Sequence, residues 1–146
     1  MRTPHPFLPH THHMPHIHAH HAPQVGALTN GNCDVSLHLS ALFDFAVTAA
    51  DAGAPKPHLP PFLAAAESAG CHPAEIVHVG DSIESDLVGA LDAGMRAVLL
   101  NRPELPARTP AEIQAMPEQS GERWIEAASL AEAAEAILGE WGASPP

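Results

Sequence analysis

Two aspartates, Asp81 and Asp86, lie five residues apart directly after a run that predicts a strand. Residues 76–79 are rich in β-branched side chains, and Gly80 allows the backbone to turn sharply at the strand exit. Asp86 then falls in the first turn of the next helix, where an acidic residue complements the helix dipole. Two carboxylates at one strand end are suitable ligands for Mg²⁺, which prefers oxygen. The alternative interpretation is an aspartate in a turn and an acidic helix N-terminus.

Thr29 and Asn30 follow another predicted strand, residues 25–29. A hydroxyl and an amide at a strand end can donate hydrogen bonds to phosphate oxygens. The alternative is turn chemistry, because Asn30 and Gly31 form an Asn-Gly pair, which is frequent in turns.

Lys56 is the only lysine of the chain, and prolines flank it on both sides. A rigidly held ammonium is a useful point charge against a phosphoryl group. The alternative, an exposed lysine that merely improves solubility, explains less in a sequence that otherwise avoids lysine.

The elements that must position these residues alternate along the chain. Strands are predicted at residues 25–29, 45–48, 76–79 and 97–100. Helices are predicted at residues 60–69, 83–94, 110–116 and 129–138, and Val35, Leu39, Leu42 and Phe43 recur at helical spacing. Such alternation indicates an α/β fold with a parallel sheet, in which ligands bind beyond the carboxyl ends of the strands.

The composition excludes some classes of protein. A formal net charge of −11 argues against binding to nucleic acid or to an anionic membrane surface. No apolar run approaches the ~20 residues of a membrane helix, and the first residues include no secretory h-region. We therefore expect an intracellular, most simply cytoplasmic, protein, with an organellar address left open.

Three regions are expected along the chain. Residues 1–24 form a His- and Pro-rich tail without regular structure, which contains eight of the 12 histidines. Residues 25–140 form the folded domain, and residues 141–146 a disordered C-terminus. The tail has the alternative of weak metal binding by neutral imidazoles.

Taken together, the order and spacing of these motifs resemble motifs II, III and IV of the haloacid dehalogenase superfamily, also known as HAD-like hydrolases. The resemblance covers residues 25–103, including the stretches at residues 26–32, 56–58, 78–81 and 93–95. The sequence looks most like the phosphatase branch that acts on flavin mononucleotide or the phosphorylated riboflavin precursor. The family fold is a Rossmann-like parallel sheet flanked by helices.

The resemblance implies a role for each candidate residue. Thr29 would hydrogen-bond the transferring phosphoryl group, Asn30 would help to shape that pocket, and Lys56 would neutralise charge on it. Asp81 would ligate Mg²⁺, and Asp86 would support the ion directly or through water. The family mechanism is attack by an aspartate on phosphorus, followed by hydrolysis of the aspartyl-phosphate. The implied partner is a small phosphorylated metabolite.

The sequence departs from the family at the nucleophile, which the resemblance places in motif I, an Asp-x-Asp-x-Thr sequence at the end of the family's first strand. No acidic residue precedes Asp34, and the chain contains no Asp-x-Asp pair. We therefore expect a partial core that lacks the first, central strand and the cap domain, and that has no turnover alone. Residues 25–29 and 76–79 would each have an unpaired edge, which predicts marginal stability. Alternatives are an inactive fragment, a non-enzymatic phosphate- or metal-binding module, or half of an enzyme completed by an unidentified chain.

Overall fold

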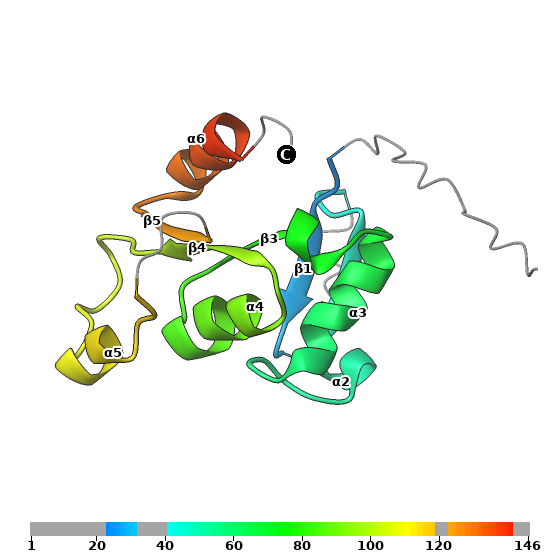
Figure 1. Ribbon diagram of the computed structural model, residues 1–146, viewed down its shortest axis with the longest axis horizontal. Coiled ribbons are helices and arrows are strands. Elements are labelled where there is room, and N and C mark those ends of the chain that lie inside the picture. Colours follow the sequence, from blue (N-terminus) through cyan, green and yellow to red (C-terminus); the bar gives the residue numbers. More distant parts are fainter. Residues whose placement is uncertain (1–22, 32–40, 119–122, 142–146) are drawn as a thin grey trace, which may run out of the picture.

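A computed structural model describes residues 23–31, 41–118 and 123–141 (Figure 1). The strands are β1 (Gly26–Thr29), β2 (Phe45–Thr48), β3 (Val77–Gly80), β4 (Arg96–Leu100) and β5 (Trp124–Ala127). The helices are α2 (Ala49–Ala52), α3 (Leu59–Ala69), α4 (Gly89–Asp92), α5 (Pro110–Gln114) and α6 (Leu130–Glu140), with a 3₁₀ turn η1 (Pro73–Glu75) and a π-helical turn η2 (Ile83–Val88). No helix in this described part is long and apolar enough to cross a membrane.

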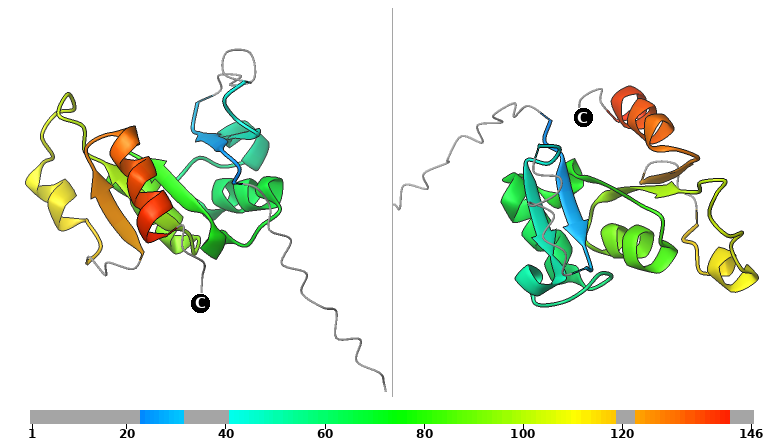
Figure 2. Two further views of the ribbon diagram at one scale, coloured as in Figure 1. Left: turned by 90° about the horizontal axis from the view of Figure 1, so that it is seen from above. Right: turned by 180° about the vertical axis from the view of Figure 1, so that it is seen from behind.

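The strands form two separate parallel sheets, with the orders β1-β2 and β3-β4-β5. Register runs from Gly26 beside Phe45 in the first sheet and from Val77 beside Arg96 in the second. The ribbon views place β1 on the side of its sheet that faces β3 (Figures 1 and 2). Among the described strands, β1 and β3 are therefore edge strands of their sheets, and they face each other.

The larger sheet is covered on both faces because β4 alternates its side chains between two clusters. Ala97 and Leu99 pack with Phe62 and Leu87 from α3 and η2, whereas Val98 and Leu100 pack with Ala133 and neighbouring residues on the α6 side. Figure 2 shows α4 and α6 on opposite sides of this sheet. Apolar side chains on both faces are typical of parallel strands in α/β proteins.

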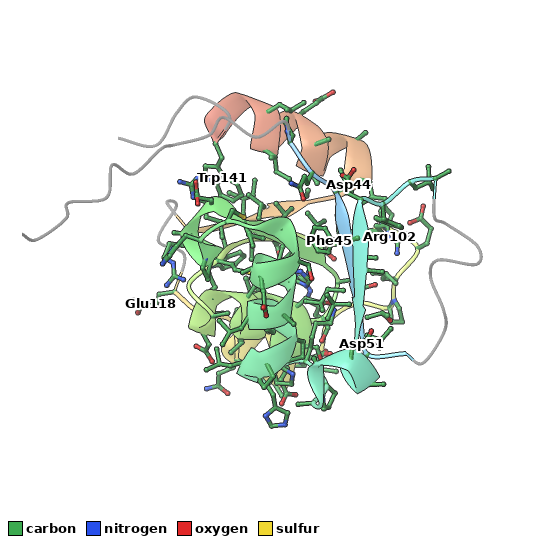
Figure 3. All side chains as sticks on the ribbon, turned by 90° about the vertical axis from the view of Figure 1, so that its right-hand side faces the viewer. Asp44, Phe45, Asp51, Arg102, Glu118 and Trp141 are labelled. Atoms are coloured by element: carbon green, nitrogen blue, oxygen red, sulfur yellow. The ribbon has the colours of Figure 1, made fainter. Side chains whose placement is uncertain are left out.

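The smaller sheet packs against α3. This helix begins with two prolines in its first turn and ends at Gly70, whose φ of 68° suits a left-handed C-cap. Its buried face includes Phe62 and Ala66, and Leu28 of β1 packs against the same cluster. Within the small sheet, the ring of Phe45 lies against Gly26, where there is no side chain in the way (Figure 3).

The predicted α/β class with a parallel sheet is confirmed, and the four predicted strands are present to within one residue. Three elements were not predicted: the one-turn helix α2, the 3₁₀ turn η1 and the strand β5. The segment 83–94, predicted as one α-helix, is instead a π-helical turn followed by α4. The helix predicted from the spacing of Val35, Leu39, Leu42 and Phe43 falls mainly on residues 32–40, which lie outside the described residues, as do residues 1–22 and 142–146 of the predicted tails.

Candidate functional site

Asn30 connects the end of β1 to the loop that carries Lys56. Its amide nitrogen donates to the Lys56 carbonyl oxygen at 3.0 Å, and its Oδ1 accepts from the Lys56 backbone N–H at 2.6 Å. A primary amide satisfies one donor and one acceptor of the same residue in this way, much as a neighbouring strand would. Asn30 therefore fixes the backbone from which the lysine side chain extends.

The side chain of Lys56 reaches Asp86, at the start of the segment that follows β3. The Nζ–Oδ1 distance is 2.5 Å, and the two side chains are only 11% and 10% exposed. A charge-assisted hydrogen bond with so little access to water is stronger than a surface ion pair. It joins the loop between α2 and α3 to η2, the turn that follows β3.

Gly80 makes room for Asp86 to fold back over the strand end. A Cβ at position 80 would lie 2.3 Å from Cγ of Asp86, which is closer than any real contact. The backbone N–H of Ser82 then donates to the second oxygen of Asp86 at 3.0 Å. Ser82 also caps η2, since its hydroxyl accepts from the N–H of Ser85. This turn explains why a glycine precedes the aspartates.

His78 is a part of the site that the sequence analysis did not identify. It lies in β3, and its Nε2 is 3.0 Å from the same oxygen of Asp86 that Lys56 contacts. Its ring is 12% exposed and meets the buried ring of Phe62 edge-on at 5.4 Å. The only sequence signal was a polar ring between two valines in an otherwise apolar strand.

These contacts determine the protonation state of Asp86. Burial alone would raise the pKa of its carboxyl group. Hydrogen bonds from His78, Lys56 and the Ser82 backbone, together with the positive charge of Lys56, outweigh burial and hold that pKa well below its usual range. Asp86 is therefore an anion in the folded protein at neutral pH, and both of its oxygens accept hydrogen bonds.

Thr29 and Asp81 lie at the ends of the two facing strands. Thr29 is half-buried, and its hydroxyl accepts from the Gly31 N–H at 3.0 Å, which leaves its own proton free for another acceptor. Asp81 is exposed, with Arg102 beyond the end of β4 at 3.8 Å. Figure 3 shows Arg102 among the side chains at the outside of the molecule.

The predicted residues therefore separate into a hydrogen-bonded group of three and two residues, Thr29 and Asp81, that are not bonded to it. Hydrogen bonds connect Asn30, Lys56 and Asp86, and His78 joins them. Thr29 and Asp81 present a hydroxyl and a carboxylate that share no hydrogen bond with this group. Within the described ranges, no three His, Cys, Asp or Glu side chains are grouped for a metal ion. Asp81 has an exposed carboxylate, and carboxylate oxygens are groups that Mg²⁺ prefers.

The chain is similar to a hydrolase family and to two phosphatases. The model of the HAD-hydrolase-like family matches residues 53–119. The chain is 39% identical over 79 residues to the Escherichia coli 5-amino-6-(5-phospho-D-ribitylamino)uracil phosphatase YigB. The aligned residues cover 53% of this chain and 33% of the relative. It is 37% identical over 67 residues to a glyceraldehyde 3-phosphate phosphatase from Methanothermobacter thermautotrophicus, covering 46% of this chain and 30% of the relative.

The fold has a similar counterpart among solved structures. A 2-haloacid dehalogenase from Pseudomonas syringae superimposes with a TM-score of 0.64 and 34% identity, over 81% of this chain and 47% of that one. The chain thus spans about a third of the length of these curated relatives and about half of the solved structure.

Proposed function

Because the chain belongs to the haloacid dehalogenase-like hydrolase superfamily, we propose that it forms the phosphate- and metal-binding half of a Mg²⁺-dependent phosphatase. The substrate would be the phosphate monoester of a small metabolite. The curated relatives support the reaction class, since both are named as phosphatases of small phosphorylated compounds.

The observation that carries the proposal is the way in which Lys56 is held. The only ammonium side chain of the protein is fixed through its backbone by Asn30 and through its Nζ by Asp86. A cation that is already oriented costs no reorganisation when negative charge develops beside it, which is how enzymes stabilise phosphoryl transfer.

The other predicted site residues have the following proposed roles. The Thr29 hydroxyl would donate to a phosphoryl oxygen, and Asn30 would keep the neighbouring loop in place. Asp81 would bind Mg²⁺, while Asp86 supports the site from beneath through Lys56 and the Ser82 amide. Bound Mg²⁺ would supply charge neutralisation at the phosphoryl oxygens.

The attacking aspartate has no counterpart in the 146 residues, which contain no Asp-x-Asp pair. We propose that these residues alone have no phosphatase turnover, and that a strand carrying the nucleophile would lie between β1 and β3. Among the described strands, both end their sheets there, so no other described strand pairs with the facing side of either.

Among substrates, the phosphorylated riboflavin precursor is the first candidate, followed by flavin mononucleotide. The E. coli relative is named for that precursor, and the family match over residues 53–119 includes Lys56 and Asp81. A cap domain that would select the substrate is not among the described residues, so substrate choice would depend on sequence outside them.

Phosphate binding provides the test of the site. Inorganic phosphate, with and without Mg²⁺, is titrated into the ¹⁵N-labelled chain, and amide shifts are followed by NMR. We expect the largest shifts at Thr29, Asn30 and Lys56, strengthened by Mg²⁺ in the wild type but not in Asp81→Asn. Glu84→Gln, an exposed acid in the same segment, is the matched control. Equal strengthening in Asp81→Asn would contradict the metal role.

The specific observation that favours a second function, a non-enzymatic phosphate-binding module, is the missing Asp-x-Asp pair. Adding a polypeptide that carries a strand ending in Asp-x-Asp-x-Thr separates the two. Mg²⁺-dependent hydrolysis of the riboflavin precursor that Asp81→Asn abolishes supports the phosphatase. Phosphate binding without turnover in the completed assembly supports the binding module.

A further inference from the structure

The histidine of β3 makes a contact that neither the family match nor the predicted roles explain. Its Nε2 lies 3.0 Å from Oδ1 of Asp86, the oxygen that also accepts from Lys56 Nζ at 2.5 Å. Three donors, from Lys56, His78 and the Ser82 backbone, thus converge on one buried carboxylate. We refer to Lys56, His78 and Asp86 as the Asp86 network.

The geometry gives each donor a separate task. The Ser82 N–H holds Oδ2, which fixes one end of the carboxylate to the turn after β3. His78, in strand β3, donates to Oδ1 and so favours the orientation in which this oxygen faces Lys56. Because a carboxylate is an acceptor only, the donors around it help to set its orientation.

The imidazole itself is held by packing. Phe62 is fully buried in α3, and its ring meets His78 in a T-shaped arrangement at 5.4 Å. Edge-to-face contact restricts the orientation of both rings. The core of the molecule therefore determines the direction of the Nε2 donor.

We propose that His78 is a positioning residue for Lys56, which it aligns through Asp86 without contacting substrate itself. The inference rests on the proposed function for the use that is made of Lys56. Its structural content, the alignment of one ammonium group by one imidazole, can be measured without any turnover.

The sequence makes that measurement unambiguous, because the chain has a single lysine. The full 146-residue chain is treated with limiting acetic anhydride at one fixed neutral pH, and modified peptides are quantified by mass spectrometry. The rate at Lys56 is divided by the rate at the α-amino group of the same chain, which serves as an internal reference. An aligned ammonium is protected from acetylation, and a released one reacts faster.

We expect His78→Phe to raise this ratio on the order of tenfold, the size that follows from losing a hydrogen bond to a charged group. His78→Gln keeps an N–H donor and should leave the ratio close to that of the wild type. His58→Phe, an exposed histidine two residues from Lys56, is the matched control and should not change it.

The outcomes decide between hydrogen bonding and packing. An unchanged ratio in folded His78→Phe would overturn the proposal, and so would an equal rise in His78→Gln. If circular dichroism shows that His78→Phe does not fold, the pair His78→Gln and His78→Asn carries the test, because the Asn amide is one methylene too short to reach Asp86. An equal ratio in these two variants then overturns the proposal. Since acetylation needs neither phosphate nor Mg²⁺, failure of the proposed phosphatase activity leaves this result intact, and the reverse also holds.

Discussion

The three-stranded sheet is covered on both faces, whereas the two-stranded sheet depends mainly on α3. Residues 97–100 of β4 are all buried, but Val47 is the only buried residue among the described strands β1 and β2. The candidate site takes Asn30 from the turn after β1 of the small sheet. It takes His78 from β3 of the large sheet and Asp86 from η2, which follows β3. The well-packed large sheet thus orients the Lys56 side chain through Asp86, whereas the Lys56 backbone is bonded to Asn30, beside the less well-packed small sheet.

The largest expected effect comes from cavities in the two regions. Leu99→Ala, in the fully buried part of β4, should lower the free energy of unfolding by about 4 kcal/mol, because both the contacts and the buried area are lost. Leu28→Ala in β1 removes the same atoms from a half-buried position and should cost about half as much. Urea unfolding of both variants measures the difference, and equal costs would contradict the comparison.

Next in size is the ion pair that joins the regions. Asp86→Asn leaves Lys56 without its counter-ion at a site that is about nine-tenths buried, and should cost about 3 kcal/mol. The effect should appear as earlier unfolding of the small sheet, seen as faster hydrogen exchange in β1 and β2 than in β4. Uniform acceleration across both sheets would show that the pair stabilises the whole domain.

The same variant gives a dependence on pH whose sign follows from Asp86. Its pKa is lower in the folded protein than the ~3.9 of an unfolded aspartate, so its contribution to stability is present above that value and is lost as the pH falls toward the folded pKa. The difference in unfolding free energy between wild type and Asp86→Asn should be constant above about pH 5 and shrink below about pH 4. Glu84→Gln, on the surface of the same turn, is the control.

A smaller effect is expected from Asn30→Ala, which removes two hydrogen bonds to the Lys56 backbone at an exposed position. We expect a loss of about 1 kcal/mol, because water replaces part of what is removed. Asn30→Asp keeps the acceptor and loses the donor, and should fall between the wild type and the alanine variant. Thermal unfolding of the three proteins gives the order.

The smallest effect belongs to Arg102→Gln. Its guanidinium lies 3.8 Å from Asp81 with both side chains about half exposed, so the change in unfolding free energy should stay below about 0.5 kcal/mol. A loss as large as that of Asp86→Asn would show that the outer edge of the site is as tightly coupled as its interior.

The sequence was sufficient for the alternation of strands and helices, because β-branched runs and turn residues act locally. It was insufficient for β5, a four-residue strand that includes the charged Glu126, and for η2, where the turn bends around a side chain. The spacing of Asp81 and Asp86 predicted that both lie near one strand end, but not that Asp86 faces inward and Asp81 outward. Their metal roles remain predictions. The role of His78 could not be predicted from the sequence, because its partner Asp86 is brought over the strand only by the turn at Gly80.

That turn also has a consequence for how the sequence can vary. Position 80 has no room for even a methyl group, because Cγ of Asp86 occupies the space at 2.3 Å. Polarity, charge and size of a replacement are therefore irrelevant there, since every one of them begins with the same Cβ. In a saturation library, position 80 should tolerate no replacement, while the exposed position 84 in the same segment accepts many.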